Sequence, residues 1–479
     1  MSARPSRTDR NRREPHRDSG NKGHAIVVGA SMAGLSIAKA LTGSFDRVTV
    51  LDRDGIPDDI ANRKGVPQGR HLHVLLTAGG DALEELFPGL LDEFVADGAA
   101  TGDLGVRGRM CVNGHRLARG RLGRDDILAS RPFVEGHVRG RVREDPAVIF
   151  TQGRRVRALV TTGDRRRVVG VEVVPNTGDG SSETLAADLV VDCSGRRSRM
   201  PAWLEGLGYR PPDVDELRVE VRYATRQYRL PADALGGDLF ALITPAPDQP
   251  RGGGMALIEG DRWMVTLVGM GGEQPPLDPN GYDAFAARLP AGDIRDAIAQ
   301  GQALDQPVAF RYPANVRRRY ERLRDFPEGL LVAGDAVCSF NPIYGQGMTV
   351  AALEAVALRG LLDQGMVPSA RSWFRSIAPI VDVPWDLAIG SDLAIPSIEG
   401  RRSLQIRLVN RYMDRFYIAA AHDPVLAVMF GRVSSLLDSP TRLLHPATVA
   451  RVIRGNLRRP PRQPLRTSTD SLTQERPAS

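Results

Sequence analysis

Strand-like and helix-like patterns alternate along the first part of the chain. His24–Val28 is a continuous apolar run, as is typical of a buried parallel strand, and Arg47–Leu51 is a second run that ends at Asp52. Between them, Gly29–Gly34 leads into a helical pattern that extends to about Leu41. A strand, a glycine turn, a helix and a second strand with a terminal acid are the parts of a dinucleotide-binding βαβ unit.

Four residues of this unit have defined physical roles. Gly29 allows the tight turn and Gly34 lets the helix pack closely on the strand, whereas Asp52 can accept hydrogen bonds from an adenosine ribose. Ser31 occupies the middle glycine position, where a small side chain still lets a pyrophosphate approach the helix N-terminus. We therefore expect one half of a nucleotide site here.

The alternation continues to about residue 200. The segment Asp126–Arg143 has a helical pattern, and we expect strands at Val148–Phe150, Val156–Val160 and Val168–Val174. Ala187–Asp192 is another apolar strand that ends in a glycine turn. This second strand-to-glycine turn returns the chain to the nucleotide domain.

Residues 217–310 have a different pattern. Leu217–Tyr228 alternates between apolar and polar residues, and Ala256–Ile258 and Trp263–Val268 flank a turn as a hairpin does. The pattern predicts an antiparallel sheet with one buried face, inserted between two pieces of the nucleotide domain. Such a sheet is a suitable wall for an apolar substrate pocket.

A second candidate half-site follows this sheet. The apolar strand Leu330–Ala333 leads to Asp335, a loop containing Pro342 follows, and Gly345 and Gly347 open an alanine-rich helical pattern. The bare amides and the positive dipole end of such a helix favour an anionic or electron-rich group. The carboxylate of Asp335 can accept from sugar hydroxyls, so we expect a split nucleotide site.

The C-terminal residues 366–455 have helical patterns that we expect five prolines to interrupt. These prolines are Pro379, Pro384, Pro396, Pro424 and Pro440. Within Ser403–Ala420, one helical face is apolar and the opposite face is basic. The apolar face comprises Leu404, Leu408, Val409, Tyr412, Met413 and Phe416, and the basic face comprises Arg407, Arg411 and Arg415. We interpret the apolar face as core packing. A helix on a membrane surface is the alternative, because an apolar substrate can arrive from a membrane.

Composition and charge describe a folded chain with basic ends. The 479 residues are 42% hydrophobic and 25% charged, which suits two or three subdomains, and no apolar run approaches the roughly 20 residues of a membrane span. Residues 1–22 carry +4 and residues 451–479 carry +5, so the rest of the chain carries −2 of the net charge of +7. We therefore expect disordered basic tails rather than a nucleic-acid interface.

Cysteine usage favours a reducing compartment. Cys111, Cys193 and Cys338 form no disulfide framework and no zinc-binding spacing. The N-terminus also lacks the apolar segment of a secretory signal. We therefore expect a cytoplasmic protein without a metal site.

Several motifs together resemble the FAD monooxygenases with the para-hydroxybenzoate hydroxylase fold, over roughly residues 24–390. Within that group the chain is most similar to bacterial polyether epoxidases, such as the monensin and lasalocid epoxidases, which are relatives of squalene monooxygenase. Besides the βαβ unit, the motifs are Arg63–Gln68, Ala129–Pro132, Phe340–Met348 and Asp382–Trp385. The implied fold is α/β: a Rossmann-like FAD-binding domain with an inserted antiparallel substrate sheet and a helical C-terminal region.

The resemblance also implies the cofactor site and the domain bounds. FAD would be bound by Gly29, Ser31, Gly34, Asp52, Arg53, Arg63, Arg131, Val156, Asp335, Gly345, Gln346, Gly347 and Met348. The last four would place helix amides near the flavin N1 and C2 carbonyl, where negative charge accumulates on reduction. We expect a tail at 1–22, FAD-binding segments at 23–200 (with an excursion toward the substrate domain at about 75–125) and 316–365, a substrate domain at 201–315, helices at 366–455 and a tail at 456–479.

The implied chemistry belongs mainly to the cofactor. Through a C4a-hydroperoxyflavin formed with O2, one oxygen atom would enter an apolar natural product, and alkene epoxidation in secondary metabolism is the favoured outcome. No catalytic acid, base or metal is expected. Electrons would come from NADPH, NADH or a separate flavin reductase. The separate reductase stays an alternative because Asp192–Gly195 departs from the Asp-Gly motif that the hydroxylases use for FAD and NAD(P)H.

Other interpretations of the same motifs remain open. Hydroxylation of an aromatic substrate, reduction of an isoprenoid and a flavin-binding sensor that docks a partner would all use a similar cofactor site. A tryptophan-type halogenase should carry Trp-x-Trp-x-Ile-Pro and a catalytic lysine, but the four tryptophans lack that spacing and Lys64 is the one candidate lysine. Oxygen uptake with substrate separates the monooxygenase from the reductase and the sensor.

Overall fold

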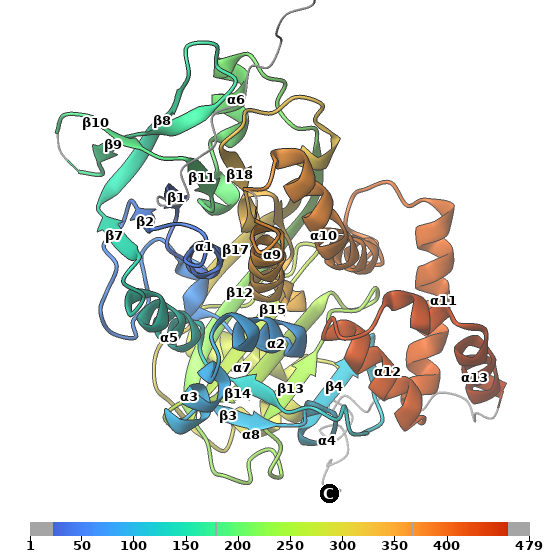
Figure 1. Cartoon of the computed structure of the whole chain (residues 1–479). Helices are drawn as coiled ribbons and strands as arrows, with labels where there is room; N and C mark the ends of the chain where they lie inside the picture. The colour runs from blue at the N-terminus through green and yellow to red at the C-terminus, as the bar shows by residue number, and fades with distance from the viewer. Residues whose placement is uncertain (1–22, 178–179, 366, 458–479) are drawn as a thin grey trace, which may run out of the picture.

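A computed structural model of the chain describes residues 23–177, 180–365 and 367–457 (Figure 1). The expected tail 1–22 lies outside the described residues, as does the second tail from residue 458. The bound of 456 for that second tail was two residues too early, because the last helix, α13 (Pro446–Leu457), includes Asn456 and Leu457.

A five-stranded, fully parallel sheet lies at the centre of the N-terminal part. Its strand order is β18-β11-β1-β2-β7. The strands are β1 (His24–Val28), β2 (Arg47–Asp52), β7 (Val148–Gln152), β11 (Leu189–Asp192) and β18 (Leu330–Val332). Strand β18 comes from the second half of the chain and pairs with β11 at Val191 and Leu331. Both expected half-sites therefore follow strands of the same sheet, at the edge where its carboxyl ends meet.

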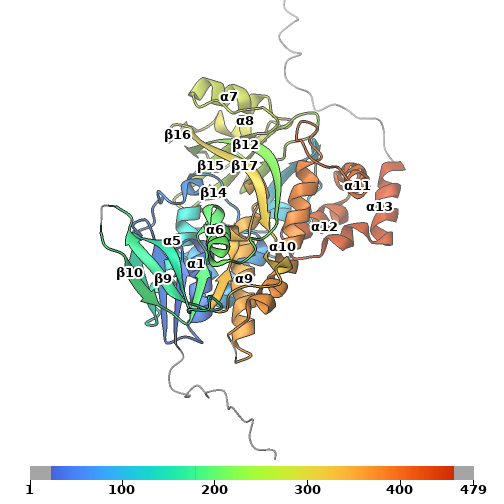
Figure 2. The ribbon, with the colours of Figure 1, turned by 90° about the horizontal axis from the view of Figure 1, so that it is seen from above.

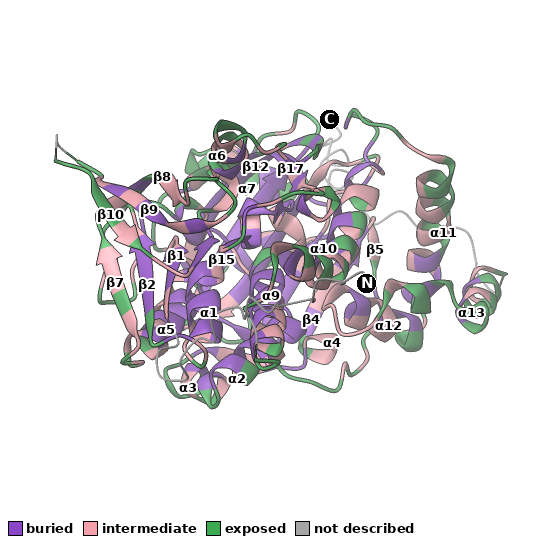
Figure 3. Cartoon of the chain, turned by 45° about the horizontal axis from the view of Figure 1, so that its top comes forward, coloured by how far each residue is buried: buried purple, intermediate pink, exposed green. Residues whose placement is uncertain are grey.

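Helices and a second sheet cover this parallel sheet. Helix α1 (Met32–Leu41) contacts α9 (Gln346–Leu362) and α5 (Arg131–Arg143), and α2 (Thr77–Leu86) also packs on α9. A three-stranded antiparallel sheet packs against strands β2 and β11. It comprises β8 (Arg154–Thr161), β9 (Val168–Pro175) and β10 (Glu183–Ala186). Figure 3 shows the resulting core as a continuous buried region across α1, α9 and the sheet.

The inserted region is a larger sheet with mostly antiparallel pairing, of order β19-β17-β12-β15-β14-β13-β4-β5, with β16 also paired to β12. Its strands are β4 (Gly108–Val112), β5 (His115–Arg116), β12 (Val214–Arg229), β13 (Phe240–Ile243), β14 (Arg251–Ile258), β15 (Arg262–Gly269), β16 (Gln302–Ala303), β17 (Val308–Arg318) and β19 (Cys338–Ser339). The expected hairpin is β14 and β15, with Ala256 opposite Met264. Two short helices, α7 (Pro279–Ala287) and α8 (Asp293–Ile298), pack on one face of this sheet, and β4 joins it from the excursion near residue 110.

A smaller group of elements lies between the parallel sheet and the large sheet along the chain. It comprises the 3-10 turn η1 (Pro67–Arg70), α3 (Leu90–Ala96), β3 (Ala100–Gly102), α4 (Leu104–Arg107) and β6 (Asp126–Leu128). Strand β6 corrects the expected helix from Asp126, since its residues pair with β3 and the helix begins at Arg131, capped by Ser130.

The expected interruption of the C-terminal helices by Pro379 and Pro384 was wrong. Helix α10 (Ala370–Asp392) runs through both prolines. A proline inside a helix costs about 3 kcal/mol because it removes one backbone hydrogen bond. The buried face of α10, which includes Trp373, Ile377 and Trp385, offsets that cost by packing on the nucleotide domain. Pro424, in contrast, begins helix α12 (Pro424–Ser434).

Helices α11 (Leu404–Ala420), α12 and α13 form a separate layer at one side of the molecule, opposite the β8–β10 sheet (Figure 2). The core-packing interpretation of α11 holds for one half of the helix only. Phe416 is fully buried in a cluster with α12 and β4, whereas Leu404 and Leu408 are 65% and 60% exposed. Across the described residues, we find no helix that is both long and apolar enough to cross a membrane.

Candidate active site

The first half-site is the turn between β1 and α1. Gly29 has φ of +106°, and a Cβ there would lie 2.5 Å from the carbonyl oxygen of Cys193. A Cβ on Gly34 would lie 1.7 Å from the Gly29 oxygen, so both positions require glycine. Ser31, at the N-cap of α1, makes no side-chain cap hydrogen bond. The first amides of α1 are therefore available to a phosphate group.

The acid at the end of β2 holds the glycine turn in place. Asp52 accepts hydrogen bonds from the Ala30 amide at 2.9 Å and from the Arg63 guanidinium at 2.8 Å, while its other oxygen accepts from the Asp54 amide. A carboxylate offers about four acceptor positions. At least one position therefore remains for a ribose hydroxyl.

Arg63 lies beneath the turn, with its side chain only 3% exposed. It donates to the Ala30 carbonyl, to Asp52 and to Glu135, which it contacts at 2.8 Å. Because both terminal nitrogens are engaged, the geometry supports a role in holding Ala30 and Asp52. A direct contact of Arg63 with FAD stays a prediction.

Arg131 joins the same polar cluster from the first turn of α5. Its guanidinium donates to the Ser31 hydroxyl at 2.9 Å and to Glu135 at 3.1 Å, and Ser31 also donates to Glu135. Burial alone would raise the pKa of Glu135, but Arg131 and Arg63 hold it below the ordinary value. Glu135 was not among the predicted site residues, although its i,i+4 spacing from Arg131 was visible in the sequence.

The second half-site begins at Gly334, whose φ is +64°. The Asp335 carboxylate accepts no hydrogen bond from any residue that the structure describes. Burial raises its pKa, while Arg196, Arg131 and Arg318 oppose that rise. An acceptor held among arginines without a hydrogen-bond partner suits the hydroxyl groups of a ribityl or ribose chain.

A buried acid that the sequence did not indicate lies behind this turn. Glu354, on α9, accepts from the Gly334 amide at 2.6 Å. Burial raises the pKa of Glu354 to about 8, despite the Gly334 amide, and Asp335 adds to the rise. Glu354 is therefore largely protonated at neutral pH and supports the turn without adding a charge.

The start of helix α9 completes the second half-site. Gly345 has φ of +68° and provides no side-chain cap for the helix. A Cβ on Gly347 would meet nothing within 4 Å, and the buried side-chain oxygen of Gln346 has no hydrogen-bond partner among the described residues. The uncapped backbone amides at the start of α9, together with Met348 in the first turn, suit a flat group that carries negative charge.

The remaining two predicted residues are placed differently. Val156, on β8, is only 6% exposed and packs in the main core, so its backbone alone could face a cofactor. Arg53 follows Asp52 with its side chain 53% exposed and lies 3.7 Å from Asp54. Neither position gives further support for a cofactor contact.

A buried carboxylate anchors the loop between the two parts of this half-site. Asp392, at the end of α10, accepts from Asn315 at 2.6 Å, from Asn341 at 2.9 Å and from the Tyr344 hydroxyl at 2.7 Å. Burial raises its pKa to about 6, and the three donors oppose that rise. The 3-10 turn η5 (Pro342–Tyr344) is thereby fixed to both α10 and the large sheet.

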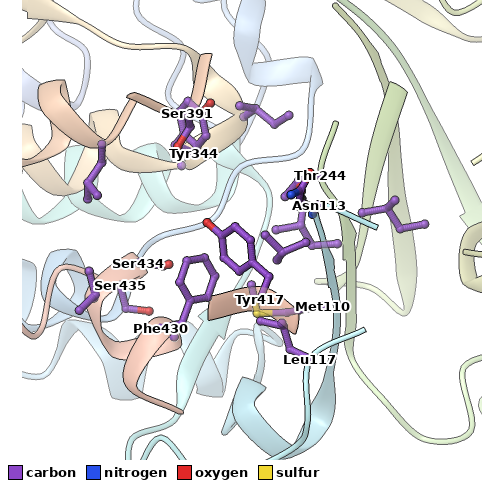
Figure 4. A pocket seen from close by; sticks show the side chains of 18 of the residues that line it. Met110, Asn113, Leu117, Thr244, Tyr344, Ser391, Tyr417, Phe430, Ser434 and Ser435 are labelled. Atoms are coloured by element: carbon purple, nitrogen blue, oxygen red, sulfur yellow. Dashed lines mark hydrogen bonds between the residues drawn. The ribbon is translucent and has the colours of Figure 1, made fainter. Parts of the chain in front are cut away.

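A cavity of about 420 Å³ adjoins this loop (Figure 4). One wall is the β4 and β13–β15 part of the large sheet, another is helices α11 and α12, and the segment 342–346 also lines it. Most of the lining is apolar, with Leu72, Met110, Leu117, Leu242 and Phe430 among its residues. The volume lies within the roughly 300–1,000 Å³ of sites for small organic ligands.

The two half-sites fit FAD. The open amides of α1 suit its pyrophosphate, the free acceptor positions of Asp52 and Asp335 suit its hydroxyl groups, and the uncapped start of α9 suits its ring system. The apolar cavity lies against the same loop. Bound there, the cofactor would supply the oxidative chemistry, and the chain would hold and shield a substrate.

Comparisons with known proteins agree with this fold. No family model matches the chain. Protein Rv3254 of Mycobacterium tuberculosis is 36% identical over 472 residues, which cover 93% of this chain and 98% of that protein. Squalene epoxidase 1 of Arabidopsis thaliana is 26% identical over 70% of this chain and 59% of its own length. The 6-methylpretetramide 4-monooxygenase of Streptomyces rimosus is 28% identical over 71% of this chain and 75% of its own length.

Solved structures share the architecture at lower sequence identity. The p-nitrophenol 4-monooxygenase PnpA of Pseudomonas putida is 16% identical with a TM-score of 0.59, over 86% of this chain and 98% of that one. CmlS, a flavin-dependent halogenase, is 17% identical with a TM-score of 0.63, over 89% of this chain and 79% of that one. The predicted fold is thereby confirmed. The chain belongs to the same family as the Mycobacterium tuberculosis protein. It is one of the FAD-dependent monooxygenases of the para-hydroxybenzoate hydroxylase fold.

Proposed function

We propose that this monooxygenase adds one oxygen atom to an alkene of an apolar natural product, giving an epoxide. One atom of O2 enters the carbon–carbon double bond and the other leaves as water. Two electrons and two protons balance the reaction, and the electrons come from NADPH, NADH or a separate flavin reductase. The FAD contacts we propose are those of the turns at Gly29–Gly34 and Gly334–Asp335 and of the helix start at Gly345–Met348.

The observation that carries the proposal is the apolar cavity lined by Pro342–Gln346. Its walls include leucine, methionine and aromatic side chains, and its volume suits a small organic molecule. An apolar site shields a reactive oxygen species from bulk water and holds an apolar substrate without charged contacts. No group of three or more metal-binding side chains occurs in the described part of the chain, and the proposed reaction needs none.

A second candidate is hydroxylation of an aromatic ring. The relative from Streptomyces rimosus is named as a monooxygenase of 6-methylpretetramide, whereas the relative from Arabidopsis thaliana is named as an epoxidase. The cavity wall also contains Phe240 and Phe430, against which an aromatic ring can pack. Both reactions add one oxygen atom, so the product structure decides between them.

The test is product analysis with the purified protein, FAD, a reductant system and a panel of polyenes, terpenes and phenols. We expect an alkene product heavier by one oxygen atom that opens to a diol in acid, as an epoxide does. A phenolic product instead supports the aromatic hydroxylase. Oxygen uptake that yields only hydrogen peroxide with every compound would count against both.

A further inference from the structure

The charges around the cavity are nearly all negative. Its lining includes Asp126, Asp386 and Asp414 but a single basic residue, Arg119. Arg119 is already paired with Asp238 at 2.6 Å. No uncommitted cation among the described lining residues is therefore available to a carboxylate on the substrate, and burying an unpaired charge is costly.

One hydroxyl group, in the loop 342–346 beside the cavity, is held in a fixed position. Tyr344 donates to Asp392 at 2.7 Å, and Asn341 and Asn315 fix that carboxylate from two other directions. A tyrosine oxygen that donates its proton can still accept a hydrogen bond. Donation to a buried carboxylate also polarises the hydroxyl and makes its oxygen a better acceptor.

A second hydroxyl group approaches from the helical layer. Tyr417, on α11, packs edge-on against Phe430 at a centroid distance of 5.2 Å. Its side chain points toward Tyr344 and Ser391 (Figure 4), and its hydroxyl forms no hydrogen bond with the residues that the structure describes. Burial raises the pKa of Tyr417, so the group keeps its proton and remains a donor.

The two tyrosines belong to one electrostatic environment. Burial and then Asp392 hold the pKa of Tyr344 well above its usual value. The neighbouring Ser391 hydroxyl opposes that rise, and Tyr417 adds to it. A hydroxyl oxygen placed between them can accept a hydrogen bond from Tyr417 and can donate its own proton in a hydrogen bond to the Tyr344 oxygen. A hydroxyl group satisfies both contacts, whereas a hydrocarbon satisfies neither and a carboxylate cannot donate.

We propose that the substrate is a neutral, largely apolar molecule with a hydroxyl group held between Tyr417 and Tyr344. This inference rests on the proposed function, since it concerns the same cavity. The apolar remainder of the molecule lies along the sheet wall, beside Leu242 and Met110. The hydroxyl group thereby fixes which part of the molecule faces the flavin.

A matched series of C15 probes tests the inference: farnesene, farnesol and farnesoic acid, which differ at one end of the chain. Each is titrated into the FAD-loaded protein, and the dissociation constant is read from the absorption change of the bound flavin. We expect farnesol to bind about thirtyfold more tightly than farnesene, because its two hydrogen bonds contribute about 1 kcal/mol each. Farnesoic acid at pH 8 should bind most weakly, because its carboxylate is charged and cannot donate.

Two variants on helix α11 locate the contact. Tyr417→Phe should weaken farnesol about fivefold and leave farnesene unchanged. Tyr412→Phe is the matched control, because it removes a hydroxyl from the same helix that donates instead to the Leu443 carbonyl. It should leave the order and the ratios of the three probes unchanged.

The outcomes separate the inference from the proposed function. A protein that binds no FAD would overturn both. An FAD-loaded protein that epoxidises an alkene but binds farnesoic acid as tightly as farnesol would overturn the inference alone, as would equal farnesol binding by wild type and Tyr417→Phe. An absorption spectrum that responds to none of the three probes would also count against it.

Discussion

Among single residues, Asp335 is the one whose side chain we expect to bind FAD at the second half-site. It lies among Arg131, Arg196 and Arg318, and its carboxylate accepts from no described residue. Gly334 precedes it with a positive φ that only glycine adopts without strain. A group so placed contributes to ligand binding more than to folding.

We expect Asp335→Ala to lose at least nine tenths of the FAD that copurifies with wild type, because the acceptor for its hydroxyl groups is removed. The absorbance ratio at 450 and 280 nm measures the loading. Asp164→Ala is the control, since Asp164 lies in an exposed turn. An Asp335→Ala protein with full flavin content would remove this residue from the site.

The raised pKa of Glu354 should make the free energy of unfolding depend on pH. Its pKa is raised from 4.5 to about 8, mainly by burial. A carboxyl group with a raised pKa stabilises the fold fully below the pKa of the unfolded chain, and that stability is lost as the pH rises through the folded value. Glu354→Gln cannot ionise, so its free energy of unfolding relative to wild type should increase between pH 5 and pH 8.5.

Urea unfolding of both proteins at those two pH values measures the difference. The comparison within each pH cancels the contribution of the other titrating groups. If the two proteins keep a constant difference across the range, Glu354 is already ionised in the folded state at pH 5 and its pKa is not raised.

On the scale of elements, helix α10 shows how packing overrides local preference. Pro379 is exposed and removes a backbone hydrogen bond, yet the helix continues because Trp373, Ile377 and Val381 are buried on its other face. We expect Pro379→Ala to stabilise the protein by roughly 1–3 kcal/mol, because the missing bond can form. Pro396→Ala, beyond the end of α10, should give no such gain in denaturant unfolding. Equal effects would contradict the helical account.

Helix α11 is deeply buried in its second half, whereas its first half contacts the molecule mainly through Ile406 and Asn410. Phe416→Ala should lower the free energy of unfolding by about 3–5 kcal/mol, because it leaves a cavity in a fully buried cluster. Leu404→Gln and Leu408→Gln should change it by less than about 0.5 kcal/mol, because both side chains are exposed. Thermal and urea unfolding of the three variants measure this contrast. A large loss from either leucine variant would mean that the first half is buried in solution.

At the scale of the whole molecule, local sequence signals predicted the two half-sites. Gly29, Gly34, Gly334 and Gly345 occupy positions whose backbone geometry or close contacts restrict the residue type, so each turn is visible in a short segment. Strand periodicity likewise predicted the large sheet, because one of its faces is buried.

Contacts between distant segments could not be predicted in this way. Asp392 gathers Asn315, Asn341 and Tyr344 from three elements, and no local pattern marks that meeting point. The cavity depends similarly on how α11 and α12 fold back over the sheet. The identity of the proposed FAD-binding turns is therefore local information, whereas the shape of the proposed substrate pocket is a property of the assembled fold.

Transfer of one oxygen atom from O2 to the substrate is tested by a reaction under ¹⁸O2 with the purified protein, FAD, a reductant system and a polyene that perturbs the flavin spectrum. We expect a product that carries one ¹⁸O atom per oxidation, with the other atom of each O2 recovered in water. A product without the label, or consumption of labelled oxygen to hydrogen peroxide alone, would contradict it.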